Sequence, residues 1–80
     1  MLKPGQLVRI SSKFQRSDPP RGFAVFSAAP DFVNYEFVTV NDVGMILYLL
    51  HEGEDRRDDE WLVLFGEKRL AIYCDLLEMI

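Results

Sequence analysis

The feature that most constrains this chain is the stretch EWLVLFGEKRLAIYC, at residues 60–74, which predicts a β-hairpin. Two runs of β-branched, aliphatic and aromatic residues flank Gly66 and Glu67, and a type II′ turn requires positive φ at its first central residue, a role that suits glycine. Burial fixes the register, because a slip of one residue would move every side chain to the opposite face. The predicted register pairs Phe65 with Lys68, Val63 with Leu70, and Trp61 with Ile72.

Both faces of this hairpin carry apolar side chains. The first face collects Trp61, Val63, Phe65, Leu70 and Ile72. The second face collects Leu62, Leu64, Arg69, Ala71 and Tyr73. A strand with one solvated face alternates apolar with polar residues, so the second face needs cover from a loop of this chain or from another chain. This second face is the main indication of function in the sequence.

The rest of the chain alternates short apolar runs with turn residues and contains no convincing helical window. We expect strands near residues 6–10, 36–40, 45–50 and 78–80, the last of them after one helical turn near residues 75–77. Residues 13–37 are expected to form a long, aromatic-rich loop, because their prolines remove donors that a central strand needs. The pattern predicts one all-β domain, residues 1–80, with about five strands in a small barrel or sandwich.

The hydrophobic core should come from the inward-facing residues of these strands. We expect it to contain Val8, Ile10, Val43, Met45, Leu47, Val63, Phe65, Leu70, Ile72 and Leu77. Replacing Ile72 by alanine should then cost about 2–5 kcal/mol of folding free energy.

Composition excludes several classes of protein. The chain has 80 residues, a net charge of −4 and a single cysteine, so it can hold neither an internal disulfide nor a cysteine-rich zinc site. The net charge has the wrong sign for attraction to nucleic acid or anionic lipid. The apolar run at residues 43–50 is too short to span a membrane, and the first ten residues do not resemble a signal peptide. We therefore expect a soluble protein, cytoplasmic or part of an assembly built in the cytoplasm.

Three features could carry chemistry, and each has a simpler explanation. His51 is expected to be a solvated loop residue rather than a catalytic base, and Cys74 a buried thiol rather than a nucleophile. A cluster of acids near a predicted hairpin tip could hold a hard cation, but it lacks EF-hand spacing and reads as a solvated turn. The cluster comprises Glu52, Glu54, Asp55, Asp58, Asp59 and Glu60. With neither a phosphate-binding glycine loop nor a Ser/His/Asp set, we expect no enzyme activity, cofactor or metal.

The stretches GQLVRI, NDVGMILYL, EWLVLFGEKRLAIYC and DLLEMI, in this order, resemble SH3-like barrels. The likeness covers most of the chain and extends to small KOW-like proteins and to short proteins of tailed bacteriophages. It implies a barrel with a long first loop, three consecutive strands, a helical turn and a short last strand. SH3 domains that bind proline-rich peptides have an ALYDY-like segment and a tryptophan pair, whereas Trp61 stands alone here. KOW-like relatives bind through basic loops, whereas the tip EGEDRRDDE is acidic.

Two functional hypotheses follow, of different classes. The first is a non-catalytic protein-interaction or assembly module; if the phage likeness holds, it would be an accessory virion component or a modulator of a host protein. Its partner, a second copy or a foreign chain, would contact Phe23, Phe26, Phe32, Tyr35, Leu62, Leu64 and Tyr73. The alternative use of these aromatics is simply to complete a small core. The second hypothesis is a KOW-like nucleic-acid or transcription-complex binder with a basic patch of Lys3, Arg9, Lys13, Arg16 and Arg21.

Overall fold

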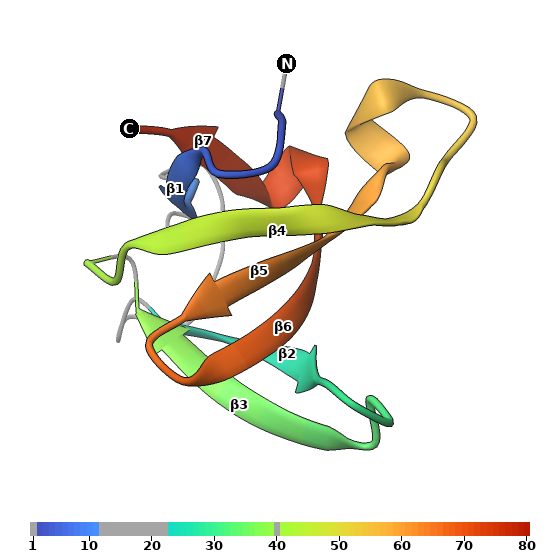
Figure 1. Cartoon of the computed structure of the whole chain (residues 1–80). Helices are drawn as coiled ribbons and strands as arrows, with labels where there is room; N and C mark the ends of the chain where they lie inside the picture. Colours follow the sequence, from blue (N-terminus) through green and yellow to red (C-terminus); the bar gives the residue numbers. More distant parts are fainter. Residues whose placement is uncertain (1, 12–22, 40) are drawn as a thin grey trace.

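The computed structural model describes residues 2–11, 23–39 and 41–80, with the backbone alone at residues 23–25. These residues form one antiparallel sheet that curls into a half-barrel (Figure 1). Its seven strands are β1 (Leu7–Ile10), β2 (Phe23–Ala28), β3 (Asn34–Thr39), β4 (Gly44–His51), β5 (Glu60–Phe65), β6 (Lys68–Tyr73) and β7 (Leu77–Met79). Their order across the sheet is β3-β2-β6-β5-β4-β1-β7, so β3 and β7 are its two edges.

The all-β prediction is confirmed in this antiparallel form, but the expected count of about five strands is wrong. Much of the region assigned to a loop is the hairpin β2–β3, which pairs continuously from Phe23–Thr39 to Ala28–Asn34. Pro30 lies in the turn between the two strands, where it removes no donor from the ladder. Pro30 therefore marks a turn, as expected, but it does not exclude strands on either side of that turn. The part of the expected loop at residues 13–22 lies outside the described residues.

The predicted β5–β6 hairpin is confirmed pair by pair. Phe65 lies opposite Lys68, Val63 opposite Leu70, and Trp61 opposite Ile72. Gly66 has a φ of 64°, and Phe32 is the one non-glycine residue with positive φ in the described part of the chain. Glu67 therefore has a negative φ, which agrees with the type II′ turn expected from the sequence.

Two single-turn 3₁₀ helices interrupt the strands. The turn η2 (Cys74–Leu76) lies within one residue of the expected position and leads into β7. The turn η1 (Arg56–Asp58) was not expected, and it folds the charged segment between β4 and β5. Among the described residues, no helix is long and apolar enough to cross a membrane.

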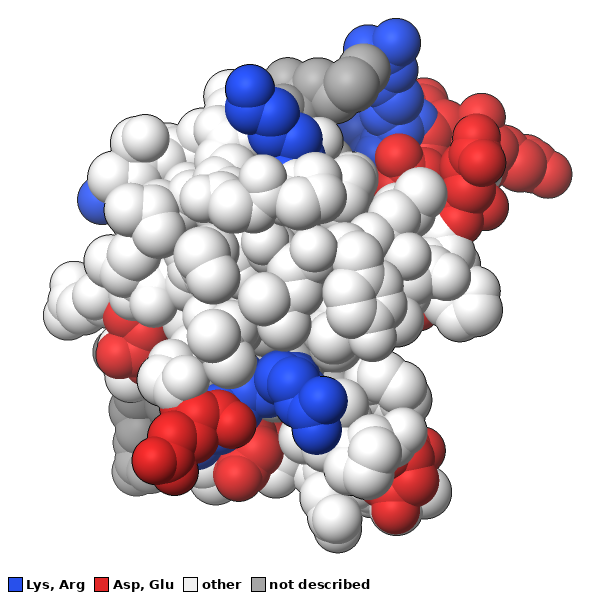
Figure 2. Space-filling view, in the orientation of Figure 1, with Lys and Arg blue, Asp and Glu red and all other residues white. Residues whose placement is uncertain are grey.

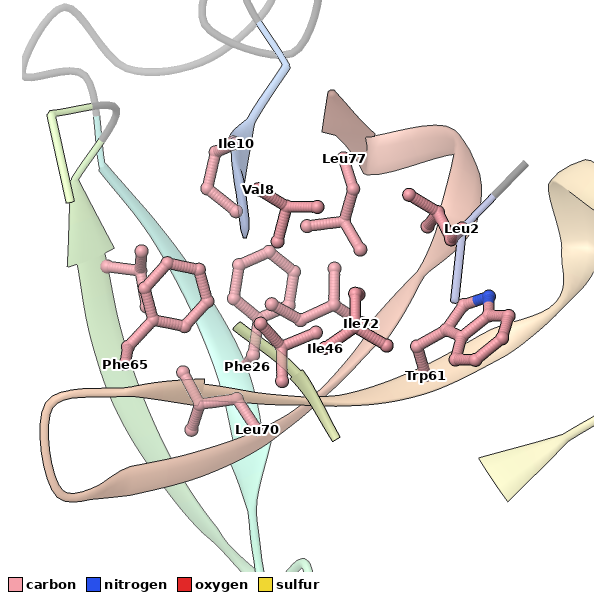
Figure 3. Packing of buried hydrophobic residues seen from close by; sticks show 12 residues of the cluster. Leu2, Val8, Ile10, Phe26, Ile46, Trp61, Phe65, Leu70, Ile72 and Leu77 are labelled. Carbon is pink, nitrogen blue, oxygen red and sulfur yellow. The ribbon is translucent and has the colours of Figure 1, made fainter. Parts of the chain in front are cut away.

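The core lies inside the curl of the sheet, where side chains from all seven strands meet (Figure 3). Its members are Leu2, Val8, Ile10, Phe26, Val38, Ile46, Trp61, Val63, Phe65, Leu70, Ile72 and Leu77. Seven of the ten predicted core residues are among them, including the whole inward set from the β5–β6 hairpin.

The three core predictions in and before β4 are wrong, because the strand presents the opposite face. Val43 is 54% exposed, whereas Ile46 is 1% exposed and lies opposite Val63. Met45 and Leu47 are half-buried. The run MILYLL is apolar on both faces, so its pattern did not identify the inward face. The structure reveals the reason at Gly44, where an added Cβ would lie 2.7 Å from the ring of Phe65.

Candidate docking surface

The outer face of the sheet carries a row of exposed tyrosines. Side chains alternate along a strand, so residues out of phase with the inward-facing Val38 and Ile72 point away from the core. On β4 the register shifts between Ile46 and Tyr48, so Tyr48 lies opposite the outward-facing Leu62. These outward residues include Tyr35 on β3, Tyr48 on β4 and Tyr73 on β6, which are 64%, 53% and 52% exposed. The outer face therefore presents large apolar rings to its surroundings on three strands.

Small and aliphatic residues lie between these tyrosines. Tyr35 lies opposite Ser27 on β2, and Tyr48 lies opposite Leu62, which in turn lies opposite Ala71. Figure 2 shows that the face over β4, β5 and β6 is largely free of charged side chains, with both basic and acidic residues near the β5–β6 turn and around residues 52–59. This arrangement places the exposed tyrosines on a face with few charged side chains and with charges at its margins.

A hollow of about 210 Å³ opens in this face, between the end of β4 and the β2–β3 turn. It is lined by Ser27, Phe32, Leu50, His51, Glu60 and Ala71. In Figure 2 the white face is indented at the right, next to the lobe formed by the β2–β3 turn. Small residues on β2 and β6 leave this space, because neither Ser27 nor Ala71 carries a side chain large enough to fill it.

Phe32 forms one wall of the hollow and has an unusual backbone. Its φ of 60° lies in the left-handed region, which bulky residues seldom adopt. Its amide donates a hydrogen bond to the Ala28 carbonyl at 2.9 Å, and the next amide, that of Val33, donates to Asp31 Oδ1 at 3.2 Å. These contacts close the turn and hold the backbone of Phe32 beside the sheet.

The upper rim of the hollow is polar. His51 Nε2 lies 3.8 Å from Glu60 Oε1, and Glu60 lies opposite Tyr73 in the sheet. The carboxylate of Glu60 is only 20% exposed, whereas the imidazole is 79% exposed. The single histidine is therefore a surface residue beside a shielded carboxylate.

The acidic segment that follows, residues 52–59, is folded rather than extended; we call it the tip loop. Asp55 caps η1, because its Oδ1 accepts a hydrogen bond from the Arg57 amide at 3.1 Å. That hydrogen bond and the charge of the Arg57 guanidinium lower the pKa of Asp55. Asp59 Oδ1 accepts a hydrogen bond from the Gly53 amide at 2.9 Å. An added Cβ on Gly53 would lie 2.5 Å from Asp58, so the loop closes tightly at this glycine.

A second recess of about 420 Å³ lies between the N-terminal segment and the tip loop, and Trp61 and Cys74 line it. Burial raises the pKa of the Cys74 thiol, and the carboxylates of Asp59 and Asp75 add to this shift. A raised pKa keeps the thiol protonated at neutral pH, which opposes nucleophilic reactivity. Trp61 Nε1 is buried and has no hydrogen-bond partner among the described residues.

The seven residues predicted to bind a partner do not all reach the surface. Tyr35 and Tyr73 are exposed, and Leu64 and Phe32 are half-buried. Leu62 and Phe26 are buried; Leu62 lies on the outer face of β5, and Phe26 belongs to the core. Phe23 starts β2, and its side chain lies outside the described residues. The structure therefore brings Tyr35, Tyr73, Leu64 and Phe32 to the outer face and places Phe26 on the opposite one.

Four residues of this surface were not predicted from the sequence. Ser27, Leu50 and Ala71 line the hollow, and Tyr48 lies opposite Leu62 on the outer face. The alternation of Tyr48 and Leu50 in MILYLL is a signal that could have found two of them. An inward Met45 and Leu47 already place Tyr48 and Leu50 outward, but the partner surface was assigned only to the expected loop and the β5–β6 hairpin. Ser27 and Ala71 are recognisable only once their strands are known to be neighbours.

Only part of the other predicted sites lies within the described residues. Of the predicted basic patch, Lys13, Arg16 and Arg21 lie outside the described residues, and Arg9 Nε lies 3.5 Å from Glu78 Oε1. No three His, Cys, Asp or Glu side chains in the described ranges come together as a metal site would require. The chain matches no protein-family model, and neither the search of curated proteins nor that of solved structures found a match.

Proposed function

We propose that this protein is a non-catalytic interaction module that docks onto another protein chain through the outer face of its sheet. The observation that carries the proposal is the exposure of Tyr35, Tyr48 and Tyr73 on one apolar face. Tyrosine is enriched at protein interfaces because its ring is large and rigid and its hydroxyl can still form hydrogen bonds.

The size of this surface supports docking. A large aromatic residue buries about 150–250 Å² when covered, so three half-exposed tyrosines leave on the order of 300–400 Å² uncovered. Apolar patches of about 300–600 Å² are the largest found on typical monomers and are often functional. A standard interface covers about 800 Å² on each partner. The tyrosines would supply nearly half of that area, and the hollow and tip loop lie beside them.

The likeness to SH3-like barrels fits the same proposal. In the half-barrel, β4, β5 and β6 are consecutive antiparallel neighbours, and η2 leads into the short strand β7, which pairs with β1. We propose that the half-barrel is a member of this architectural type. Both forms of the phage hypothesis, a virion component and a modulator of a host protein, would use such a docking face.

The nucleic-acid alternative has less support. Arg9 is engaged with Glu78, and the tip loop at the margin of the apolar face is acidic. Phosphate groups would be repelled there, because affinity for nucleic acid comes chiefly from basic contacts to the backbone.

The experiment compares proteins captured by the immobilised domain and by two variants. Tyr35→Ser with Tyr73→Ser removes two exposed rings without touching the core, so we expect an unchanged melting temperature and at least a tenfold loss of any specific partner. The control is Val43→Ser, which removes an apolar side chain of similar exposure outside the tyrosine row. The proposal fails if the tyrosine variant retains the same partners as the wild type, or if captured material is nucleic acid released by moderate salt.

A further inference from the structure

We infer that the hollow between Phe32 and Leu50 receives one bulky apolar side chain of the partner, and that a lysine or arginine beside it pairs with Glu60. This inference rests on the proposed function and specifies the chemistry of the docking segment. It names an anchor, a pocket and a flanking charge, none of which follows from an exposed tyrosine row alone.

The hollow has the size and lining of an anchor pocket. A cavity of about 150 Å³ lined by apolar side chains is enough to bind benzene, so a hollow of about 210 Å³ can take one aromatic ring or a leucine side chain. Phe32 and Leu50 form apolar walls, and Ala71 adds a methyl group. Interface energy concentrates in residues that fill such pockets while their neighbours exclude water.

The pocket is also prepared before binding. The hydrogen bond from the Phe32 amide to the Ala28 carbonyl holds the turn in its left-handed conformation. Bulky residues persist in this conformation only where the surrounding structure fixes it, and such outliers cluster at functional sites. A wall that is already in place reduces the ordering cost of binding.

Charge complementarity selects a basic flank. Residues 51–60 contain six carboxylates and two arginines. Asp55 and Asp59 are engaged within the loop, and Glu52 and Glu54 line the other recess, beside Trp61 and Cys74. Glu60 is the carboxylate that borders the hollow directly. A cation that follows the apolar anchor in the partner would therefore find the carboxylate of Glu60 at the rim, and this charge would speed encounter more than it tightens binding.

The test uses capped tripeptides and the ¹⁵N-labelled whole chain. We titrate it with an acetylated, amidated peptide that has phenylalanine between two lysines, and follow the amide signals by NMR. We expect saturable shifts at Phe32, Leu50 and Ala71. Replacing the central phenylalanine by alanine should weaken binding at least tenfold. Replacing both lysines by glutamates should weaken it several-fold at low salt, and this difference should shrink as salt is added.

A matched set of variants shows whether the hollow itself is the site. Ala71→Leu fills the hollow and should abolish the shifts, whereas Val43→Phe, an enlargement of similar size at an exposed position outside it, should leave them unchanged. If Ala71→Leu lowers the melting temperature, Leu50→Ser removes a half-buried wall instead and should weaken binding at least fivefold. Any of three results would overturn the inference: equal binding of the phenylalanine and alanine peptides, shifts confined to another surface, or no binding at 10 mM peptide. The last result would limit the binding free energy to about 2.7 kcal/mol at best.

Failure of this inference can be told apart from failure of the proposed function. If Tyr35→Ser with Tyr73→Ser loses a captured partner while Ala71→Leu keeps it, the face docks but the hollow is not its anchor pocket. If neither variant changes capture, the docking proposal itself is wrong.

Discussion

Replacing Ile46 should destabilise the domain far more than replacing its neighbour Val43, and this contrast tests the orientation of β4. Ile46 is 1% exposed and faces the core opposite Val63, whereas Val43 is 54% exposed. Deleting buried methylenes costs about 2–5 kcal/mol for isoleucine to alanine and about 0.5–1.5 kcal/mol for isoleucine to valine. Exposed positions generally change stability by less than about 0.5 kcal/mol.

These magnitudes are large for so small a domain. Typical stabilities of about 0.05–0.15 kcal/mol per residue give roughly 4–12 kcal/mol for the whole chain. Ile46→Ala could therefore remove half of the stability, so Ile46→Val is the variant to measure first. With a urea m-value near 1 kcal/mol/M, the valine variant should lower the urea midpoint by about 0.5–1.5 M.

The assay is urea unfolding followed by tryptophan fluorescence, because the single tryptophan, Trp61, is in the core next to the affected strand. The m-value should stay constant across the series. The inferred orientation of β4 is refuted if Ile46→Val is neutral, or if Val43→Ala lowers the midpoint as much as Ile46→Ala does.

Three further outcomes are expected. Gly44→Ala should cost about 1–3 kcal/mol in the same assay, since its new methyl group would meet the ring of Phe65 at 2.7 Å; a neutral result would show that the ring moves aside freely. Cys74 should react with a maleimide more slowly than a free cysteine does at pH 8, because its pKa is raised. The same shift should make the stability of the domain fall as the pH rises above 9.0, because the thiol then loses its proton in the unfolded chain before it does so in the folded one. The pKa of Asp55 is lowered, so the pH dependence has the opposite sign. The cap on η1 should persist above pH 3.8, the ordinary pKa of an aspartate, and be lost as the pH falls below that value. A pH titration of the Arg57 amide signal would detect this loss.

The sequence was most informative where local chemistry and burial agreed. The β5–β6 hairpin could be predicted to the residue pair, because Gly66 fixes the turn and one face is uniformly apolar. The turn η2 was predictable for a similar reason, since the short acidic CDLL segment follows a complete strand. Local sequence thus determined the elements that depend on few distant contacts.

The parts that could not be predicted depend on neighbours in space. In β4 both faces are apolar, and only the contact of Gly44 with Phe65 shows which side faces in. In β2 the pairing with β6 begins at Ala28 and Leu70, which are 42 positions apart. The hollow needs Ser27 and Ala71 side by side, and this adjacency exists only in the folded sheet. Tyr35 and Tyr73 were predicted as surface residues, but Tyr48 and the pocket were not.

The pairing of β1 with β7 has a consequence for the time at which the protein can fold during synthesis. Ile10 lies opposite Leu77, which follows it by 67 positions. At about 5–20 residues per second, a ribosome needs roughly 3–13 s to make that intervening chain. Until then Val8 and Ile10 lack one flanking strand, and the nascent chain exposes an apolar β segment to chaperones and to other nascent chains.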